Sequence, residues 1–222
     1  MIVAIDGPSG VGKSTVGKAV AARLGIAYLD TGAMYRAVGL AAKRHGIRLP
    51  VDDPSAVVAV ADRVTVSVTG SAANARTFLD GEDVSKEIRT PEISMYASAV
   101  SAIPGVRRRL AGMQRQLART AGGVLEGRDI GTKVVPETPH KFFLTARAEV
   151  RARRRTLELE AKGTPQPFEK VKAEMEARDR ADSTREDSPL RHDESYVVLD
   201  TSDLTVDEVV EELLRHVGAA AG

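Results

Sequence analysis

The chain has 222 residues, of which 42% are hydrophobic and 28% charged, and a formal net charge of +1, which is ordinary for a globular protein. This near-zero charge gives no overall electrostatic attraction to nucleic acid or to a membrane surface. The absence of cysteine excludes disulfides and thiolate metal sites, and no apolar run approaches the ~18 residues that span a bilayer. Because the first residues carry no basic segment and no cleavage site, we expect a cytoplasmic protein.

The first element is an apolar run at residues 2–5, which predicts a buried strand, and residues 14–24 are compatible with a helix. Between them, residues 7–14 read G-P-S-G-V-G-K-S, which matches the phosphate-binding loop pattern G-x-x-x-x-G-K-[ST] in its required strand–loop–helix context. Backbone N–H groups of such a loop face phosphate oxygens, Lys13 reaches the outer phosphates, and the Ser14 hydroxyl is placed for Mg²⁺. The candidate nucleotide-binding residues are Gly7, Pro8, Ser9, Gly10, Val11, Gly12, Lys13, Ser14 and Thr15, with Ser14 as the metal ligand.

Short apolar segments alternate with helical periodicity along the rest of the chain. Further strands are expected at residues 27–29, 124–126, 141–144 and 196–199. Helices are expected at residues 33–45, 53–64, 91–100, 104–120, 147–162, 168–178 and 205–217. This alternation predicts a parallel sheet with helices on both faces and a ligand at the carboxyl ends of the strands.

Residues 64–90 have a different character from their surroundings. Three valines between residues 64 and 68 alternate with polar residues, as in a half-buried strand. Turn-forming residues at 70–71 and 80–81 flank a second apolar segment. We therefore predict a small antiparallel insertion here, and we expect residues 218–222 to form a disordered tail.

Several classes of phosphate-loop protein lack their signature motifs in this chain. The GTPase patterns D-x-x-G and N-K-x-D are absent, since Asn74 is the only asparagine, and no transporter signature resembling L-S-G-G-Q occurs. The chain is also short for a motor or a ring ATPase. A small phosphotransferase remains.

Arginines indicate the acceptor of such an enzyme. A hydroxyl acceptor needs a carboxylate near its proton, whereas a phosphate acceptor needs its charge neutralised, which the planar guanidinium fork does well. One arginine taken alone would be read as a solvated surface charge, but here Arg128 adjoins Asp129 after a strand, and Asp182 lies between two arginines after a helix. The arginines at or near the ends of expected elements are Arg36, Arg107, Arg128, Arg178 and Arg185.

The arginine-rich helix expected at residues 147–162 allows two interpretations. Arg151, Arg154 and Arg155 share one of its faces, directly before a proline-rich break at residues 164–167. A run of charge on a helix is usually a solvated face. A mobile lid that carries arginines over a triphosphate would have the same pattern.

Three longer strings resemble bacterial cytidylate kinases. They are I-D-G-P-S-G-V-G-K-S-T at residues 5–15, L-D-T-G-A-M-Y-R at residues 29–36 and E-G-R-D-I-G-T at residues 126–132, and residues 80–92 are similar to a segment inserted in that family. The similarity extends over residues 2–217. It implies an α/β P-loop NTPase fold, a parallel sheet flanked by helices, with an inserted small antiparallel α+β monophosphate-binding region and a short lid.

The resemblance also implies a reaction and a division of the chain. The expected reaction is the ATP·Mg²⁺-dependent phosphorylation of CMP and dCMP to CDP and dCDP. The implied parts are a core at residues 1–32, 121–152 and 179–217, a monophosphate-binding region at 33–120 that includes the insertion 64–90, a lid at 153–178 and the tail 218–222.

Individual roles are implied by the family positions that these residues match. Lys13, Arg128, Arg178 and Arg185 are the expected catalytic residues, and the grip on the acceptor phosphate is formed by Thr31, Arg36, Arg128, Arg178 and Arg185. The cytosine edge is contacted by Ser98, Arg107 and Asp129. The ribose hydroxyls are contacted by Asp182. Asp129 accepting from the cytosine amine would discriminate against uracil, which has a carbonyl there. Because Thr145 stands where some members carry Asp, the metal assignment rests on Ser14 alone.

Other functions remain open at this point. A P-loop kinase of a hydroxylated metabolite, of the shikimate or gluconate type, would place a carboxylate such as Asp30 at the acceptor hydroxyl. A nucleotide-dependent switch protein would bind ATP without turning over any monophosphate. Nucleic-acid binding by the arginine-rich helix is disfavoured by the near-zero charge and the few aromatic residues. We therefore expect nucleotides as partners, no nucleic acid, no membrane and a monomer.

Overall fold

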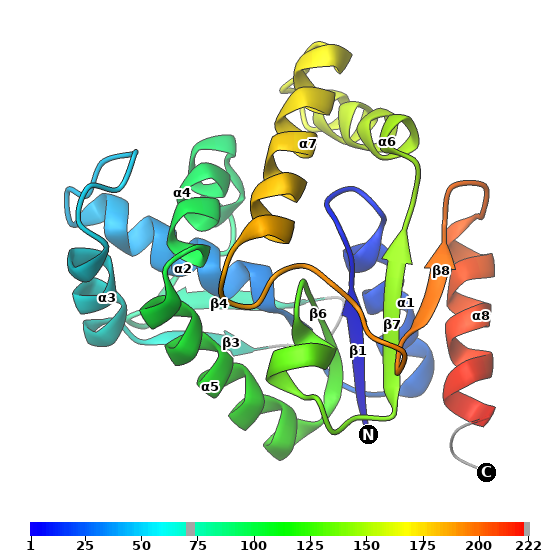
Figure 1. The fold of residues 1–222 in the computed structure, drawn as a ribbon. Coiled ribbons are helices and arrows are strands. Elements are labelled where there is room, and N and C mark those ends of the chain that lie inside the picture. Colours follow the sequence, from blue (N-terminus) through cyan, green and yellow to red (C-terminus); the bar gives the residue numbers. More distant parts are fainter. Residues whose placement is uncertain (70–73, 220–222) are drawn as a thin grey trace.

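The computed structural model describes residues 1–69 and 74–219. Its centre is a five-stranded parallel sheet of order β2-β6-β1-β7-β8 (Figure 1). The strands are β1 (Ile2–Asp6), β2 (Tyr28–Asp30), β6 (Gly123–Gly127), β7 (His140–Thr145) and β8 (Val197–Asp200). All five were expected from short apolar segments, and the predicted α/β class is confirmed.

Helices cover both faces of the sheet. On one face, α1 (Lys13–Leu24) and α8 (Val206–Ala219) pack against alternate side chains of β1. On the other face, α5 (Pro104–Ala121) and a π-helical turn, η2 (Ile130–Val134), pack around Ala4. Because β1 is buried from both sides, its sequence is continuously apolar up to its last residue.

A second apolar core lies beside the sheet and is built from the segment between β2 and α5 together with one face of α5. Its elements are α2 (Thr31–Arg44), α3 (Pro54–Arg63), β3 (Val66–Thr69), β4 (Arg76–Leu79), β5 (Glu82–Asp83), η1 (Glu87–Arg89) and α4 (Pro91–Ser101). The strands β3, β4 and β5 form a separate antiparallel sheet, which confirms the predicted insertion. The turn predicted at residues 70–71 lies outside the described residues. The strand β5 was not predicted, because its two exposed acidic residues have no apolar pattern.

Two helices lie over the carboxyl ends of β1 and β7 (Figure 1). They are α6 (Ala148–Ala161) and α7 (Phe168–Thr184), which share a small apolar cluster of Leu159, Val171 and Met175. The sequence predicts that α7 ends at residue 178, but the helix continues to Thr184. The reason is that alanine, arginine and acidic residues sustain a helix there without an interrupting glycine or proline.

The end of the chain also differs from the prediction. Helix α8 continues through residues 218 and 219, which we had assigned to a disordered tail, and residues 220–222 lie outside the described part. Among the described helices, none has both the length and the apolar character that crossing a membrane requires.

Candidate active site

The phosphate-binding loop lies between the end of β1 and the start of α1, as expected. Lys13 opens α1, and its Nζ donates a hydrogen bond to the Pro8 carbonyl oxygen at 2.7 Å, so the side chain lies back over the loop. Gly10 has a φ of +76°, and a Cβ at this position would come within 2.6 Å of Met175 Cε in α7. Both the backbone conformation and the helix packed above the loop therefore require glycine here.

Lys13 is buried among other cations. Burial, together with the charge of Arg128, lowers the pKa of Lys13 to about 7. A phosphate anion in the loop would favour the charged ammonium and raise that pKa again. The loop therefore gains positive charge at the moment when phosphates bind.

The predicted arginines come from different elements and keep unused donors. Arg36 belongs to α2 and Arg107 to α5, Arg128 follows β6, and Arg178 and Arg185 lie in and directly after α7. Among the described residues, four nitrogens of this set are buried without a hydrogen-bond partner: Arg36 Nε, Arg107 Nε, Arg178 Nε and Arg185 Nη2. A buried N–H group without an acceptor is unfavourable, so this arrangement indicates an anionic ligand.

Three of these arginines also repel one another. Burial lowers the pKa of Arg178 to about 10, and the charges of Arg128 and Arg36 contribute to the shift. Burial likewise lowers the pKa of Arg36. Like charges held this close need an anion between them, and a phosphate dianion meets that need.

Asp182 joins two of the arginines. Its carboxylate accepts from Arg128 Nε at 2.9 Å and from Arg185 Nη1 at 3.3 Å. Burial raises the pKa of Asp182, but the neighbouring arginines outweigh burial and hold it below its usual value. Arg128 Nη2 also donates to the Ser9 hydroxyl at 3.1 Å, so the same guanidinium contacts the phosphate loop.

The residues predicted to read the base form a second, buried pair. Arg107 and Asp129 are joined by an ion pair in which their side chains are only 5% and 9% exposed. The Arg107 guanidinium also lies over the Tyr35 ring, 5.5 Å from its centroid, and donates to the Ser101 carbonyl. Ser98 lies on α4 one turn before, and its carbonyl accepts from the Ser101 hydroxyl at 2.8 Å. The pair and Ser98 thus lie near one another.

Beside the Ser14 hydroxyl is a buried carboxylate that we did not single out. Glu126, in β6, accepts a hydrogen bond from the Tyr28 hydroxyl, and the nearby Ser14 hydroxyl favours the charged form of this carboxyl group. Burial and the nearby Asp30 raise its pKa. The Thr31 hydroxyl donates to the Glu126 carbonyl oxygen at 2.6 Å. A hydroxyl next to a carboxylate is an oxygen donor set that suits Mg²⁺ when phosphate oxygens complete it.

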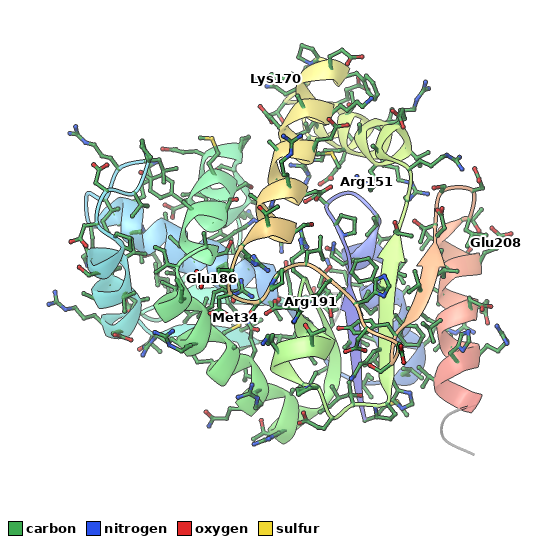
Figure 2. All side chains as sticks on the ribbon, in the orientation of Figure 1. Met34, Arg151, Lys170, Glu186, Arg191 and Glu208 are labelled. Atoms are coloured by element: carbon green, nitrogen blue, oxygen red, sulfur yellow. The ribbon has the colours of Figure 1, made fainter. Side chains whose placement is uncertain are left out.

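Helices α6 and α7 contact the phosphate loop directly. Asp179, in α7, accepts from the Ser9 backbone N–H at 3.1 Å and forms an ion pair with Arg151 of α6. Arg151 Nη1 donates to the Ser9 carbonyl oxygen at 3.0 Å. Figure 2 shows Arg151 at the point where α6 and α7 approach the loop after β1. Helices α6 and α7 therefore bind Ser9 at both its backbone N–H and its carbonyl oxygen.

The other two arginines of the expected lid face point elsewhere. Arg154 donates to the Thr201 carbonyl and hydroxyl oxygens, and Arg155 pairs with Glu158 on its own helix. Of the two interpretations of this helix face, the solvated surface applies to Arg155, and Arg154 binds the segment after β8 instead of the loop. Only Arg151 reaches the loop, because each side chain takes the nearest acceptor that its direction on α6 allows.

Glu126 could have been noticed in the sequence, since it ends a buried strand directly before Gly127 and Arg128. Asp179 has no comparable signal. Its contact with Ser9 joins residues 170 positions apart, and an acidic residue in a charged helix is ordinarily solvent-exposed.

Comparison with known proteins identifies relatives of the whole chain. The family model described as cytidylate kinase matches residues 3–219. A protein named cytidylate kinase from Caldanaerobacter subterraneus subsp. tengcongensis is 51% identical over 97% of this chain and 93% of its own length. One of the same name from Mycobacterium avium is 51% identical over 96% and 93%, and one from Syntrophotalea carbinolica is 48% identical over 98% and 92%.

Among solved structures, an uncharacterised protein from Eubacterium ventriosum superposes with a TM-score of 0.54 at 13% identity, covering 99% of this chain and 98% of its own. At that identity the likeness concerns the fold alone.

Proposed function

The chain belongs to the cytidylate kinase family, and we propose that it transfers the γ-phosphoryl group of ATP to CMP and dCMP, giving CDP and dCDP. The family membership makes it a phosphotransferase that acts on a nucleoside monophosphate. The observation that carries the proposed acceptor is the set of buried guanidinium nitrogens without partners at Arg36, Arg178 and Arg185. Several such donors together fit a monophosphate dianion, which offers three oxygens and two charges.

We propose that the donor triphosphate lies in the phosphate loop with Lys13 on its outer phosphates. The Ser14 hydroxyl would hold Mg²⁺ with the Glu126 carboxylate beside it, and the ion would neutralise part of the phosphate charge. Arg128 would act on both nucleotides, since it contacts Ser9 of the loop and Asp182 beyond it. Electrostatic stabilisation by fixed cations is the main catalytic device for phosphoryl transfer.

For the base we propose the Arg107–Asp129 pair, with Ser98 nearby, as the reader of the cytosine edge. Asp129 would accept from the exocyclic amine, whereas the uracil carbonyl offers it no proton and would repel the carboxylate. Asp182 would accept from a ribose hydroxyl in addition to its two arginines. Thr31 opens α2 at the edge of this site, and its hydroxyl would turn from the Glu126 carbonyl oxygen to the acceptor phosphate when CMP binds.

A kinase of a hydroxylated metabolite is the second candidate, and it would use Asp30 as the base. That carboxylate caps α2 by accepting from the Ala33 N–H at 3.0 Å and contacts Arg89, so it already has structural partners. This occupation supports the phosphate acceptor over the hydroxyl acceptor.

We also propose a cytoplasmic enzyme that acts as a monomer with nucleotides as its partners. The large apolar side chains that are exposed among the described residues lie apart on different elements, and none forms a broad stripe. The exposed ones are Met1, Met95, Leu157, Val198 and Val206.

The test is ADP formation from ATP·Mg²⁺ by the purified protein with CMP, dCMP, UMP, AMP, GMP, shikimate or gluconate as acceptor. We expect strong turnover with CMP and dCMP and weak turnover with UMP. Equal rates with UMP would keep the monophosphate kinase but overturn the role of Asp129. Turnover with shikimate or gluconate alone would support the second candidate.

A further inference from the structure

Asp6 is a fully buried carboxylate at the last position of β1, and none of the roles above uses it. Its Oδ1 accepts from the Ile130 backbone N–H at 2.9 Å. Its Oδ2 accepts from the Gly131 backbone N–H at 2.9 Å and from the Tyr196 hydroxyl at 2.8 Å. Three donors from two other segments hold both oxygens of this buried carboxylate, so its position is tightly fixed.

The two backbone donors have a particular place in the chain. Ile130 and Gly131 open the π-helical turn η2, immediately after Arg128 and Asp129. Asp6 is itself followed by the first residue of the phosphate loop. One side chain therefore ties the segment that carries two acceptor-site residues to the strand end from which the donor-site loop begins. Single π-helical turns are rare and occur preferentially at functional sites.

Gly131 and Tyr196 are fitted to each other. A Cβ at Gly131 would come within 2.5 Å of the Tyr196 hydroxyl oxygen, so only glycine lets this hydroxyl reach Asp6. Tyr196 lies just before β8 and is itself buried, with the Lys141 ammonium over its ring. Three separate segments thus meet at one carboxylate.

We propose that Asp6 is a positioning residue, which holds the Arg128–Asp129 turn at a fixed place relative to the phosphate loop. Its role is to set the distance between the two nucleotide sites, and it touches neither nucleotide. The inference rests on the proposed function, because it assumes that this turn serves the acceptor.

The charge state of Asp6 fits this role. Burial raises the pKa of Asp6 to about 6, against the opposing effect of its hydrogen bonds. The other charged groups that act on it are Asp129 and Lys13. At neutral pH the group is a carboxylate that accepts one hydrogen bond at Oδ1 and two at Oδ2. In Asp6→Asn the amide Nδ2 would turn an N–H group toward one of these donors, and the turn would have to move.

The experiment compares Asp6→Asn with the wild type. We expect the KM for CMP to rise and kcat to fall, together on the order of 10²-fold in kcat/KM, because a displacement of about 1 Å at reacting groups has that effect. The affinity for ATP·Mg²⁺, measured by calorimetry, should stay close to the wild-type value. The preference for CMP over UMP should weaken, because Asp129 moves with the turn.

Tyr196→Phe is the second variant, and it keeps the inference testable if Asp6→Asn does not fold. It removes one of the three donors and leaves both backbone bonds, so we expect the same changes at smaller size. Thr138→Val is the matched control. Its hydroxyl donates a partly buried hydrogen bond of 2.6 Å to the Ile2 carbonyl oxygen at the opposite end of β1, so its loss should lower the melting temperature and leave both kinetic constants unchanged.

The outcomes separate the two proposals. Wild-type protein without CMP kinase activity would overturn the proposed function. An active wild type with unchanged CMP kinetics in Tyr196→Phe and in a folded Asp6→Asn would overturn the positioning role alone. Equal losses for ATP and CMP, or an equal loss in Thr138→Val, would show a general structural effect and would also overturn it.

Discussion

The arginines at the proposed acceptor end of the site are at least partly buried, and most keep a buried nitrogen that has no partner among the described residues. Leaving a buried polar group unpaired costs about 1–3 kcal/mol. The free protein therefore holds an arrangement that is unfavourable until an anion arrives. Arg178 shows the same unfavourable environment, because burial and its cationic neighbour Arg128 lower its pKa to about 10.

Arg128 is the residue at which this arrangement can be tested most simply. In Arg128→Lys the charge remains, but one nitrogen cannot replace the fork that joins Ser9 to Asp182. We expect kcat with CMP to fall on the order of 10³-fold, as for other arginines that stabilise phosphoryl transfer. Arg155→Lys is the control, since Arg155 only pairs with Glu158 on the surface. Comparable losses in both variants would contradict the assignment.

The lowered pKa of Lys13 predicts that nucleotide binding takes up a proton. Its pKa is about 7 in the free protein, so most of its ammonium is deprotonated at pH 8. A bound triphosphate favours the charged form and raises that pKa, so ATP·Mg²⁺ binding at pH 8 should take up close to one proton. Calorimetry in buffers with different ionisation enthalpies measures this number. Binding without proton uptake would show that Lys13 is already charged in the free protein.

The sequence predicts those site residues whose role follows from a short local motif. The loop glycines, Lys13 and Ser14 follow from one pattern. The buried acids Asp6, Glu126 and Asp179 do not, because their partners come from segments distant in sequence and a carboxylate is ordinarily placed on the surface. The roles of the candidate site residues stay predictions until they are measured.

Among the elements, the lid pair α6 and α7 is the most weakly anchored. Its own apolar cluster has only Leu159, Val171 and Met175, and its hold on the phosphate loop is polar, through Asp179 and Arg151. Segments with few buried apolar contacts open at a small cost in free energy. We therefore propose that this pair moves during turnover to admit and release nucleotides.

Hydrogen exchange tests the mobility of the lid. Amides of α6 and α7 should exchange faster than those of β1 and β6 in the free protein, and they should slow when ATP·Mg²⁺ and CMP are both bound. An isolated nucleotide should slow them less. Exchange in the lid that is as slow as in the central sheet would contradict a moving lid.

Helices and strands, like single residues, are predictable from the sequence where the signal is local. Strands and helices with clear apolar periodicity were predicted correctly, including the separate antiparallel sheet. The continuation of α7 was missed, because a charged helical segment beyond residue 178 has no apolar period to follow. The π-helical turn η2 was missed because it depends on the Asp6 carboxylate, which is remote in sequence.

In the whole molecule, the site lies where three structural units meet. They are the parallel sheet, the second apolar core built around α2 and α4, and the lid pair. The sheet contributes the phosphate loop and Arg128, the second core contributes Arg36, and the lid contributes Arg178. We propose that residues 33–120 and 153–178 close over the nucleotides and exclude water, which protects ATP from hydrolysis.

The account rests centrally on a phosphate as the acceptor. The most direct measurement compares CMP with cytidine as the acceptor for ATP·Mg²⁺ in the same assay, because the two differ only in the group that the arginines are proposed to hold. We predict rapid formation of CDP from CMP and no detectable phosphorylation of cytidine. Conversion of cytidine to CMP at a rate comparable with that of CMP to CDP would contradict the central claim.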